Sequence, residues 1–105
     1  MSVRIVLCTV PDKKTGKRIA AELIEKQIAA CVNIAGPVTS LYMWEGKVQD
    51  DEEYQLIIKT SSARLDDAYK TVCALHPYDV PEWLVLDNVS GSAAYVNWLQ
   101  QIVTP

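Results

Sequence analysis

The sequence has little of what most catalytic sites require, since its 105 residues include one histidine and four glycines. One histidine leaves few options for acid–base chemistry or for a metal site built from imidazoles. Phosphate-binding loops, dinucleotide fingerprints, metalloprotease helices and nucleophile elbows are all absent. These absences argue against the enzyme classes that such motifs identify, and we predict a protein that is not an enzyme.

Positive charge is also scarce, with ten Lys and Arg against thirteen Asp and Glu and a net charge of −3. A chain without a basic patch releases no counterions from a phosphate backbone, which argues against nucleic acid and anionic membrane as partners. No apolar run is long enough to cross a bilayer. The first residues, MSVRIVLCT, lack the extended apolar segment and the cleavage site of a signal peptide.

Cysteines are few, and their number is odd. Cys8, Cys31 and Cys73 form no CxxC pair. This usage is typical of free thiols in a reducing compartment rather than of a disulfide framework. We therefore expect a cytoplasmic protein.

Hydrophobic residues, in contrast, make up 50% of the chain, which is enough for the core of a single domain spanning 1–105. Alternating and helical apolar patterns predict the order β-α-β-β-α-β-α. This is the split pattern of a ferredoxin-like α+β fold, here with an extended hairpin and an extra C-terminal helix. The predicted strands lie at 4–9, within a hairpin at 31–61 and at 83–89, and the predicted helices at 13–28, 61–76 and 93–103.

The hairpin at 31–61 has arms longer than most strands. Glu45-Gly46 forms its predicted turn, and Gly36-Pro37 marks a predicted bend or bulge. The tip should therefore extend beyond the core of so small a domain. Large apolar side chains on an unsupported arm need a partner surface, and another copy of the chain is the partner we expect. The apolar side chains of this tip are Leu41, Tyr42, Met43, Trp44 and Val48.

Four consecutive acids, Asp50 to Glu53, interrupt the return strand of the predicted hairpin. Clustered carboxylates could hold a hard cation. Alternatively, a charged segment discourages uncontrolled edge pairing. We favour the second interpretation, because consecutive strand residues point to opposite faces and do not converge.

The candidate metal ligands are Cys8, Cys31, Cys73 and His76. Cys8 lies near the end of a predicted central strand, where ligands tend to gather, and Cys73 and His76 share one helix face. Thiolate and imidazole together suit copper, and thiolate suits the cuprous ion in particular. The alternative is structural, since cysteine is a common core residue and a histidine often caps a helix end. A Cys–His nucleophile is disfavoured because no orienting third group is evident.

Six aromatic side chains also have two interpretations. They could line a ligand pocket, or they could fill the core and a subunit interface, which is the commoner use. They are Tyr42, Trp44, Tyr54, Tyr78, Trp83 and Trp98.

Several stretches taken together closely resemble the CutA divalent-cation tolerance family. The resemblance extends from about Val6 to Trp98, and the SxYxWEGK and HPYxxPE blocks, in that order and spacing, are its most specific parts. The matching stretches are VLCTVPD, LIEKQIAACVNI, SLYMWEGKV, IIKTS and HPYDVPEWLVL.

The resemblance implies a ferredoxin-like fold, a compact homotrimer joined through the long hairpins, and an architecture related to the PII signalling proteins. It also implies tolerance of copper and other divalent cations. The proposed copper ligands of the family, the cysteine of the VLCT block and the histidine before Pro-Tyr, correspond here to Cys8 and His76. Leu75 stands where some bacterial members carry a second histidine, which removes one ligand.

Three functions remain open on this basis. The first is a trimeric protein of metal tolerance that binds copper through Cys8 and His76. The second is a PII-like module that binds a small ligand in clefts between subunits. The third is a structural trimer whose motifs serve assembly alone. Tyr54, Lys59 and Glu82 lie within the motif blocks, and they either line such a cleft or close the trimer by hydrogen bonds.

Overall fold

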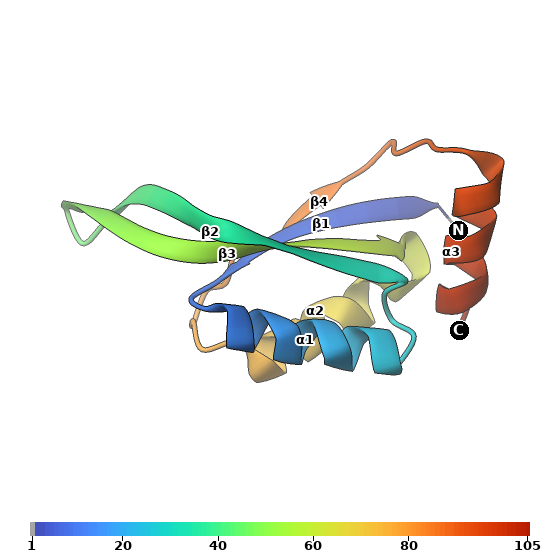
Figure 1. Cartoon of the computed structure of the whole chain (residues 1–105), viewed down its shortest axis with the longest axis horizontal. Coiled ribbons are helices and arrows are strands. Elements are labelled where there is room, and N and C mark those ends of the chain that lie inside the picture. Colours follow the sequence, from blue (N-terminus) through green and yellow to red (C-terminus); the bar gives the residue numbers. More distant parts are fainter. Residues whose placement is uncertain (1) are drawn as a thin grey trace.

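The computed structural model describes residues 2–105, which form a four-stranded antiparallel sheet and three α-helices. The sheet order is β2-β3-β1-β4, and α1 and α2 lie side by side against one face (Figure 1). The predicted α+β fold is confirmed in this respect. The elements are β1 (Val3–Val10), α1 (Lys13–Glu25), β2 (Cys31–Trp44), β3 (Lys47–Ser61), a 3₁₀ turn (Ser62–Arg64), α2 (Leu65–Leu75), β4 (Leu84–Leu86) and α3 (Ala93–Val103).

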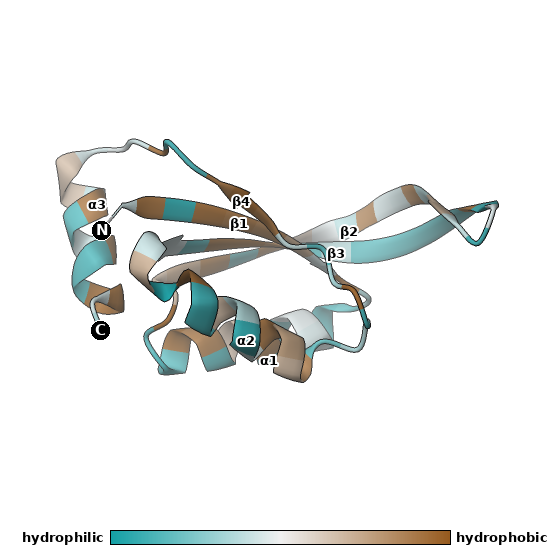
Figure 2. Cartoon of the chain, turned by 180° about the vertical axis from the view of Figure 1, so that it is seen from behind, coloured by the Kyte–Doolittle hydropathy of each residue, from teal (hydrophilic) through white to brown (hydrophobic). Residues whose placement is uncertain are grey.

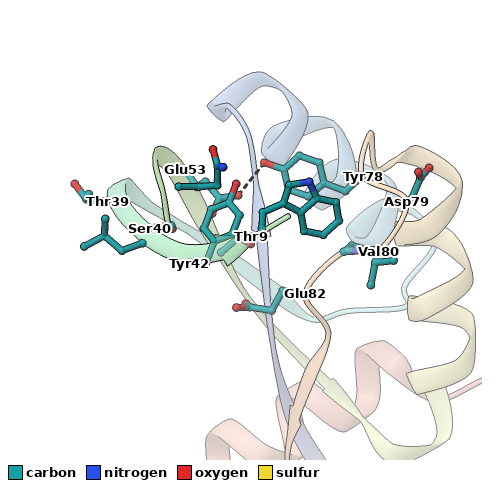
Figure 3. A pocket seen from close by; sticks show the side chains of 13 residues that line it. Thr9, Thr39, Ser40, Tyr42, Glu53, Tyr78, Asp79, Val80 and Glu82 are labelled. Atoms are coloured by element: carbon teal, nitrogen blue, oxygen red, sulfur yellow. Dashed lines mark hydrogen bonds between the residues drawn. The ribbon is translucent and has the colours of Figure 1, made fainter. Parts of the chain in front are cut away.

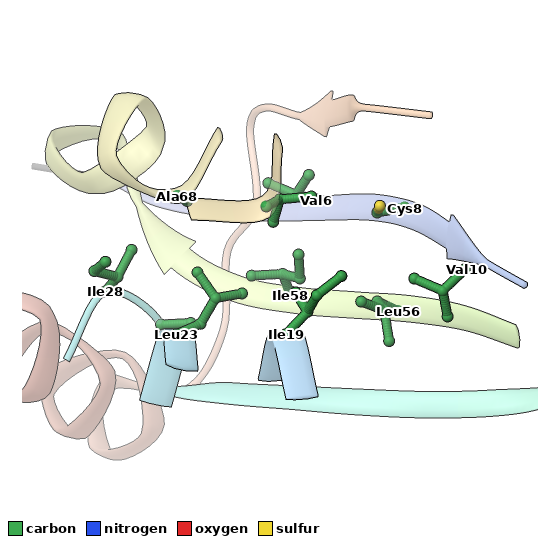
Figure 4. Packing of buried hydrophobic residues seen from close by; sticks show 11 residues of the cluster. Val6, Cys8, Val10, Ile19, Leu23, Ile28, Leu56, Ile58 and Ala68 are labelled. Atoms are coloured by element: carbon green, nitrogen blue, oxygen red, sulfur yellow. The ribbon is translucent and has the colours of Figure 1, made fainter. Parts of the chain in front are cut away.

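The core lies between the sheet and the α1–α2 layer. Alternate residues along the inner parts of β1 and β3 face the helices, as the pleat requires, and Val6, Cys8, Val10, Leu56 and Ile58 among them are fully buried. The helices contribute apolar side chains at helical spacing to the same cluster. Figure 4 shows Val6, Cys8 and Val10 on β1, Leu56 and Ile58 on β3, and Ile19 and Leu23 on α1.

Helix α1 begins where predicted and ends earlier than predicted. The Asp12 carboxylate caps its start by accepting a hydrogen bond from the Thr15 N–H at 2.7 Å. The prediction to residue 28 was too long, because Gln27 has a φ of 57° and the Ile28 N–H bonds back to the Leu23 carbonyl. This left-handed residue ends the helix and returns the chain to the sheet.

Helix α2 is preceded by the 3₁₀ turn rather than capped directly at Ser61–Ser62. It ends before Pro77, as predicted. Helix α3 has the predicted bounds, and its buried residues Leu99 and Val103 pack with Val3 in a second, smaller cluster.

The hairpin of β2 and β3 is the longest feature of the molecule. Its turn has the predicted positive φ at Gly46, 77°, and also at Glu45, 50°. The pairing shifts register between Ala35 and Val38, which confirms the predicted irregularity at Gly36-Pro37. The expected interruption of the return strand by the acids was wrong, since β3 continues through them and the extra residues lie in β2.

The outer half of the hairpin projects beyond both helices and the other strands (Figure 1). Its acidic β3 side is hydrophilic, while hydrophobic residues recur along β2 (Figure 2). The apolar side chains of the tip are exposed in the single chain. We call this projecting segment, residues 38–53, the arm.

Strand β4 is shorter than the predicted 83–89, because only Leu84–Leu86 pair with β1. After Asp87 the chain reaches Asn88, whose φ of 56° turns it toward α3. Within residues 2–105, no helix has the length and hydrophobicity needed to cross a membrane.

Candidate functional site

Cys8 lies on the central strand β1 with its side chain fully buried in the core. Its Sγ is 3.8 Å from the carbonyl oxygen of Thr9. Burial raises the pKa of Cys8 to about 12, with smaller contributions from Glu82, Cys73 and Glu53. The thiol is therefore protonated at neutral pH, and a metal ion would have to displace that proton to bind the thiolate.

His76 follows α2 directly and is also buried. The pairing of β1 with β4 stops at Leu7–Leu84, and two residues farther along β1 the Thr9 carbonyl accepts a 2.7 Å hydrogen bond from His76 Nε2. His76 Nδ1 accepts the backbone N–H of Tyr78 at 3.1 Å. These two contacts define the neutral Nε2–H tautomer, and they leave neither ring nitrogen free.

Cys8 and His76 are thus brought together at one backbone atom. Because both contact the Thr9 oxygen, the sulfur and Nε2 can be no farther apart than the sum of those two distances. Cys73 lies exposed on α2, near enough to Cys8 to affect its pKa. No group of three or more His, Cys, Asp or Glu side chains within residues 2–105 could hold a metal ion.

The donor set at this point consists of one thiol and one imidazole. Such soft and borderline donors fit a cuprous ion, whereas hard divalent cations prefer six or more oxygen ligands. The pair matches copper in donor type. In the arrangement described, copper could reach His76 only after one of the ring's hydrogen bonds is released.

A cleft of about 850 Å³ lies between the arm and the loop at 78–82 (Figure 3). Tyr78 donates a 2.8 Å hydrogen bond from its hydroxyl to Glu53 Oε2, which joins the two walls. The lining residues are Thr9, Thr39, Ser40, Leu41, Tyr42, Trp44, Gln49, Glu53, Tyr78, Asp79, Val80, Pro81 and Glu82.

The electrostatics of the cleft are set by its carboxylates. Glu53 is only 7% exposed, although its three acidic neighbours in the sequence are exposed. Burial, together with the charge of Glu53, raises the pKa of Glu82. One oxygen of Glu82, Oε1, is buried without a hydrogen-bond partner among residues 2–105. Sequence reasoning missed Glu53, because only its place opposite the bulge distinguishes it from the other acids.

Five of the six predicted aromatics divide between the core and the cleft. Tyr54 and Trp83 pack against the core, whereas Trp98 is 44% exposed and lies against Tyr95 in α3, with 5.4 Å between the ring centroids. The other three, Tyr42, Trp44 and Tyr78, line the cleft.

Of the three motif-block residues, Glu82 lines this cleft, and Tyr54 and Lys59 do not. The Lys59 ammonium instead donates to Asn33 Oδ1 and lies 3.9 Å from Cys31 Sγ.

Comparison with known proteins gives a consistent result. The family model for the CutA1 divalent ion tolerance protein matches residues 4–102. The chloroplastic protein CutA 1 of rice is 48% identical over 96 residues, which cover 91% of this chain and 54% of the rice protein. The chain therefore spans about half the length of that plant relative.

The divalent-cation tolerance protein CutA of Thermus thermophilus is 41% identical over 97 residues, covering 92% of this chain and 94% of the relative. A solved structure of the Thermus thermophilus protein superimposes with a TM-score of 0.91 at 40% identity, covering 94% of this chain and 96% of the solved chain. These descriptions name tolerance of divalent cations, and none names a catalysed reaction.

Proposed function

Because the chain belongs to the CutA1 divalent ion tolerance family, we propose that it acts as a homotrimeric, non-enzymatic protein that binds copper through Cys8 and His76. The observation that supports this proposal is that the Cys8 thiol and the His76 imidazole, from distant parts of the sequence, both contact the Thr9 carbonyl oxygen. Cys8 and His76 of the same chain form the proposed site, and we propose that residues 1–105 form a single domain.

The proposed site binds copper at a cost. Cys8 must lose a proton held by its raised pKa, and His76 must release Thr9 or Tyr78. Cys8 would then bind the soft copper ion as a thiolate, and the charge of the ion would stabilise that thiolate within the core. Since Leu75 stands beside His76 in place of a second imidazole, we propose a site of low coordination number that favours the cuprous ion.

The proposed trimer rests on the exposed apolar surface. Leu41, Met43 and Val48 on the arm are each more than half exposed in the single chain. Leu84 and Leu86 on the edge strand β4 are exposed as well. Apolar surface distributed along a projecting arm and a sheet edge is suited to burial against further copies of the same chain. We propose that the protein acts in the reducing cytoplasm, on the basis of its three free thiols.

An anaerobic titration with Cu(I), in competition with a chromogenic chelator, tests the site. We expect the wild type to bind one Cu(I) per chain and the Cys8→Ser/His76→Ala variant to lose that binding. Cys31→Ser is the matched control, because this thiol lies on β2 outside the Cys8–His76 pair. Indistinguishable binding by the wild type and the double variant would rule out the proposed ligands.

A second candidate function is supported by the cleft. A concave surface of about 850 Å³ is of the size that holds small molecules in other proteins. We therefore keep the PII-like alternative, in which a small ligand binds in the cleft and a neighbouring subunit closes it. A thermal-shift screen of metabolites should then show stabilisation by a ligand. Absence of any hit at millimolar concentration would exclude this alternative.

A further inference from the structure

We propose that metal binding at the candidate site weakens the hydrogen bond between Tyr78 and Glu53, and thereby frees the loop at 78–82 from the arm. This inference rests on the proposed copper site, and it gives that site a way to signal its occupancy to the arm. The connection is continuous, because His76 contacts the Tyr78 backbone and the Tyr78 side chain contacts Glu53 at the base of the arm.

Both ring nitrogens of His76 already have a partner. Nε2–H donates to the Thr9 carbonyl at 2.7 Å, and Nδ1 accepts the Tyr78 N–H at 3.1 Å. Because a backbone N–H can only donate, Nδ1 carries the lone pair of the neutral ring and Nε2 carries the proton. As a metal ligand, His76 must offer a lone pair from one of these two nitrogens.

Either nitrogen, as the ligand, deprives the Tyr78 N–H of its acceptor. Nδ1 would use the lone pair that the Tyr78 N–H now contacts. Nε2 could act only after the ring proton moves to Nδ1, and Nδ1–H would then face the Tyr78 N–H. Two donors form no hydrogen bond with each other, so the bond to Tyr78 is lost in both cases.

Tyr78, rather than His76, is the residue that can move away. His76 is buried, and its backbone N–H bonds to the Val72 carbonyl at 2.8 Å, which fixes it to the end of α2. Tyr78 lies in an exposed loop, where Val80 is 82% exposed. Segments with few buried contacts shift most readily, so we expect the loop to yield.

A shift of Tyr78 reaches the arm through its side chain. Its ring lies against the His76 imidazole, with 4.7 Å between the ring centroids, and its hydroxyl donates to Glu53 Oε2 at 2.8 Å (Figure 3). Glu53 is buried, and the pairing of β3 with β2 holds it opposite Val38. The carboxylate therefore cannot follow the loop far, and the hydrogen bond lengthens and weakens.

The effect of this coupling has a definite sign, because coupling between two sites is reciprocal. If an occupied metal site weakens the bond between Tyr78 and Glu53, that bond must in turn oppose metal binding. Removal of the bond should therefore tighten metal binding. A variant that merely disturbs the position of His76 should have the opposite effect.

Anaerobic titration with Cu(I) against a chromogenic chelator tests the inference on Tyr78→Phe, which keeps the ring and the backbone N–H. We expect its Cu(I) affinity to be about tenfold higher than that of the wild type, because a hydrogen bond to a carboxylate no longer opposes binding. Tyr42→Phe is the matched control. It also removes a hydroxyl that donates to a carboxylate, that of Asp51, but both residues belong to the arm. Its Cu(I) affinity should equal that of the wild type.

Amide hydrogen exchange of the wild type supplies a readout that does not depend on any variant. The Tyr78 N–H should exchange faster in the Cu(I)-loaded protein than in the metal-free protein, because it has lost its acceptor on His76. Unchanged exchange at this amide would overturn the inference.

The titration separates the inference from the copper site on which it rests. If the wild type binds Cu(I) and Tyr78→Phe binds it equally or more weakly, the copper site stands and the coupling is wrong. The coupling is also wrong if Tyr42→Phe tightens binding as much as Tyr78→Phe does. If the wild type binds no Cu(I), the proposed site is wrong and the coupling fails with it.

Discussion

Replacing Trp44 with alanine should weaken self-association of the chain more than any other single truncation on the arm. Trp44 ends β2 and is 59% exposed in the single chain. Since a tryptophan can bury about 150–250 Å², roughly 90–150 Å² of it remains for a neighbour to cover. At about 25 cal/mol per Å², this area is worth roughly 2–4 kcal/mol per subunit. A trimer loses three such contacts, so its total stabilisation should fall by about 7–11 kcal/mol.

Sedimentation velocity over a dilution series measures this loss. Tyr42→Ala on the arm should act in the same direction, because Tyr42 is 43% exposed. Tyr69→Ala is the matched control, since Tyr69 is 45% exposed but lies on α2, away from the arm. The reasoning is refuted if Trp44→Ala dissociates at the same concentration as the wild type, or if Tyr69→Ala weakens association equally.

Three further predictions concern stability at fixed protein concentration. Leu56→Ala should lower the free energy of unfolding by about 2–5 kcal/mol in urea, because Leu56 is fully buried; an unchanged midpoint would contradict the assigned core. His76→Ala should cost about 1–3 kcal/mol, because it removes the donor to the Thr9 carbonyl; a neutral effect would mean that water replaces the imidazole. Raising the pH should destabilise the wild type more than Cys8→Ala, since the pKa of Cys8 rises on folding from 9.0 to about 12. That contribution is complete below pH 9 and is lost toward pH 12, by about 4 kcal/mol in all; parallel pH profiles of the two proteins would contradict it.

The hairpin and α3 could be predicted because their signals are local. Each signal acts over a few residues: the alternation along β2 and β3, Gly46 at the turn, and Gly36-Pro37 at the bulge. The length of β4 could not be predicted, because the alternating pattern at 83–89 fits a strand of seven residues as well as the observed strand of three. The pairing of β4 with β1 ends at Leu86, and the left-handed Asn88 then turns the chain toward α3.

The sequence names Cys8 and His76 as candidate metal ligands, but their relative geometry could not be predicted from it. Cys8 and His76 came from residue chemistry and from the family resemblance. The atom that joins them is the Thr9 carbonyl, and a backbone oxygen has no signature in the sequence. For the same reason, the sequence could not predict that backbone groups would form hydrogen bonds with both ring nitrogens of His76.

The cleft could be predicted only in part. Its aromatics were identified, but the division between core and cleft depends on which side of the sheet each strand position faces after the bulge. Glu53 shows this most clearly, since it lies beside the register shift, is buried and accepts a hydrogen bond from Tyr78, while the adjacent Glu52 is exposed.

The claim that copies of this chain cover one another's arms is tested most directly by the mass of the protein in dilute solution. Sedimentation equilibrium should give three times the chain mass of 11.7 kDa, with no lighter species at micromolar concentration. A stable particle of 11.7 kDa would leave Trp44 in water and contradict the account.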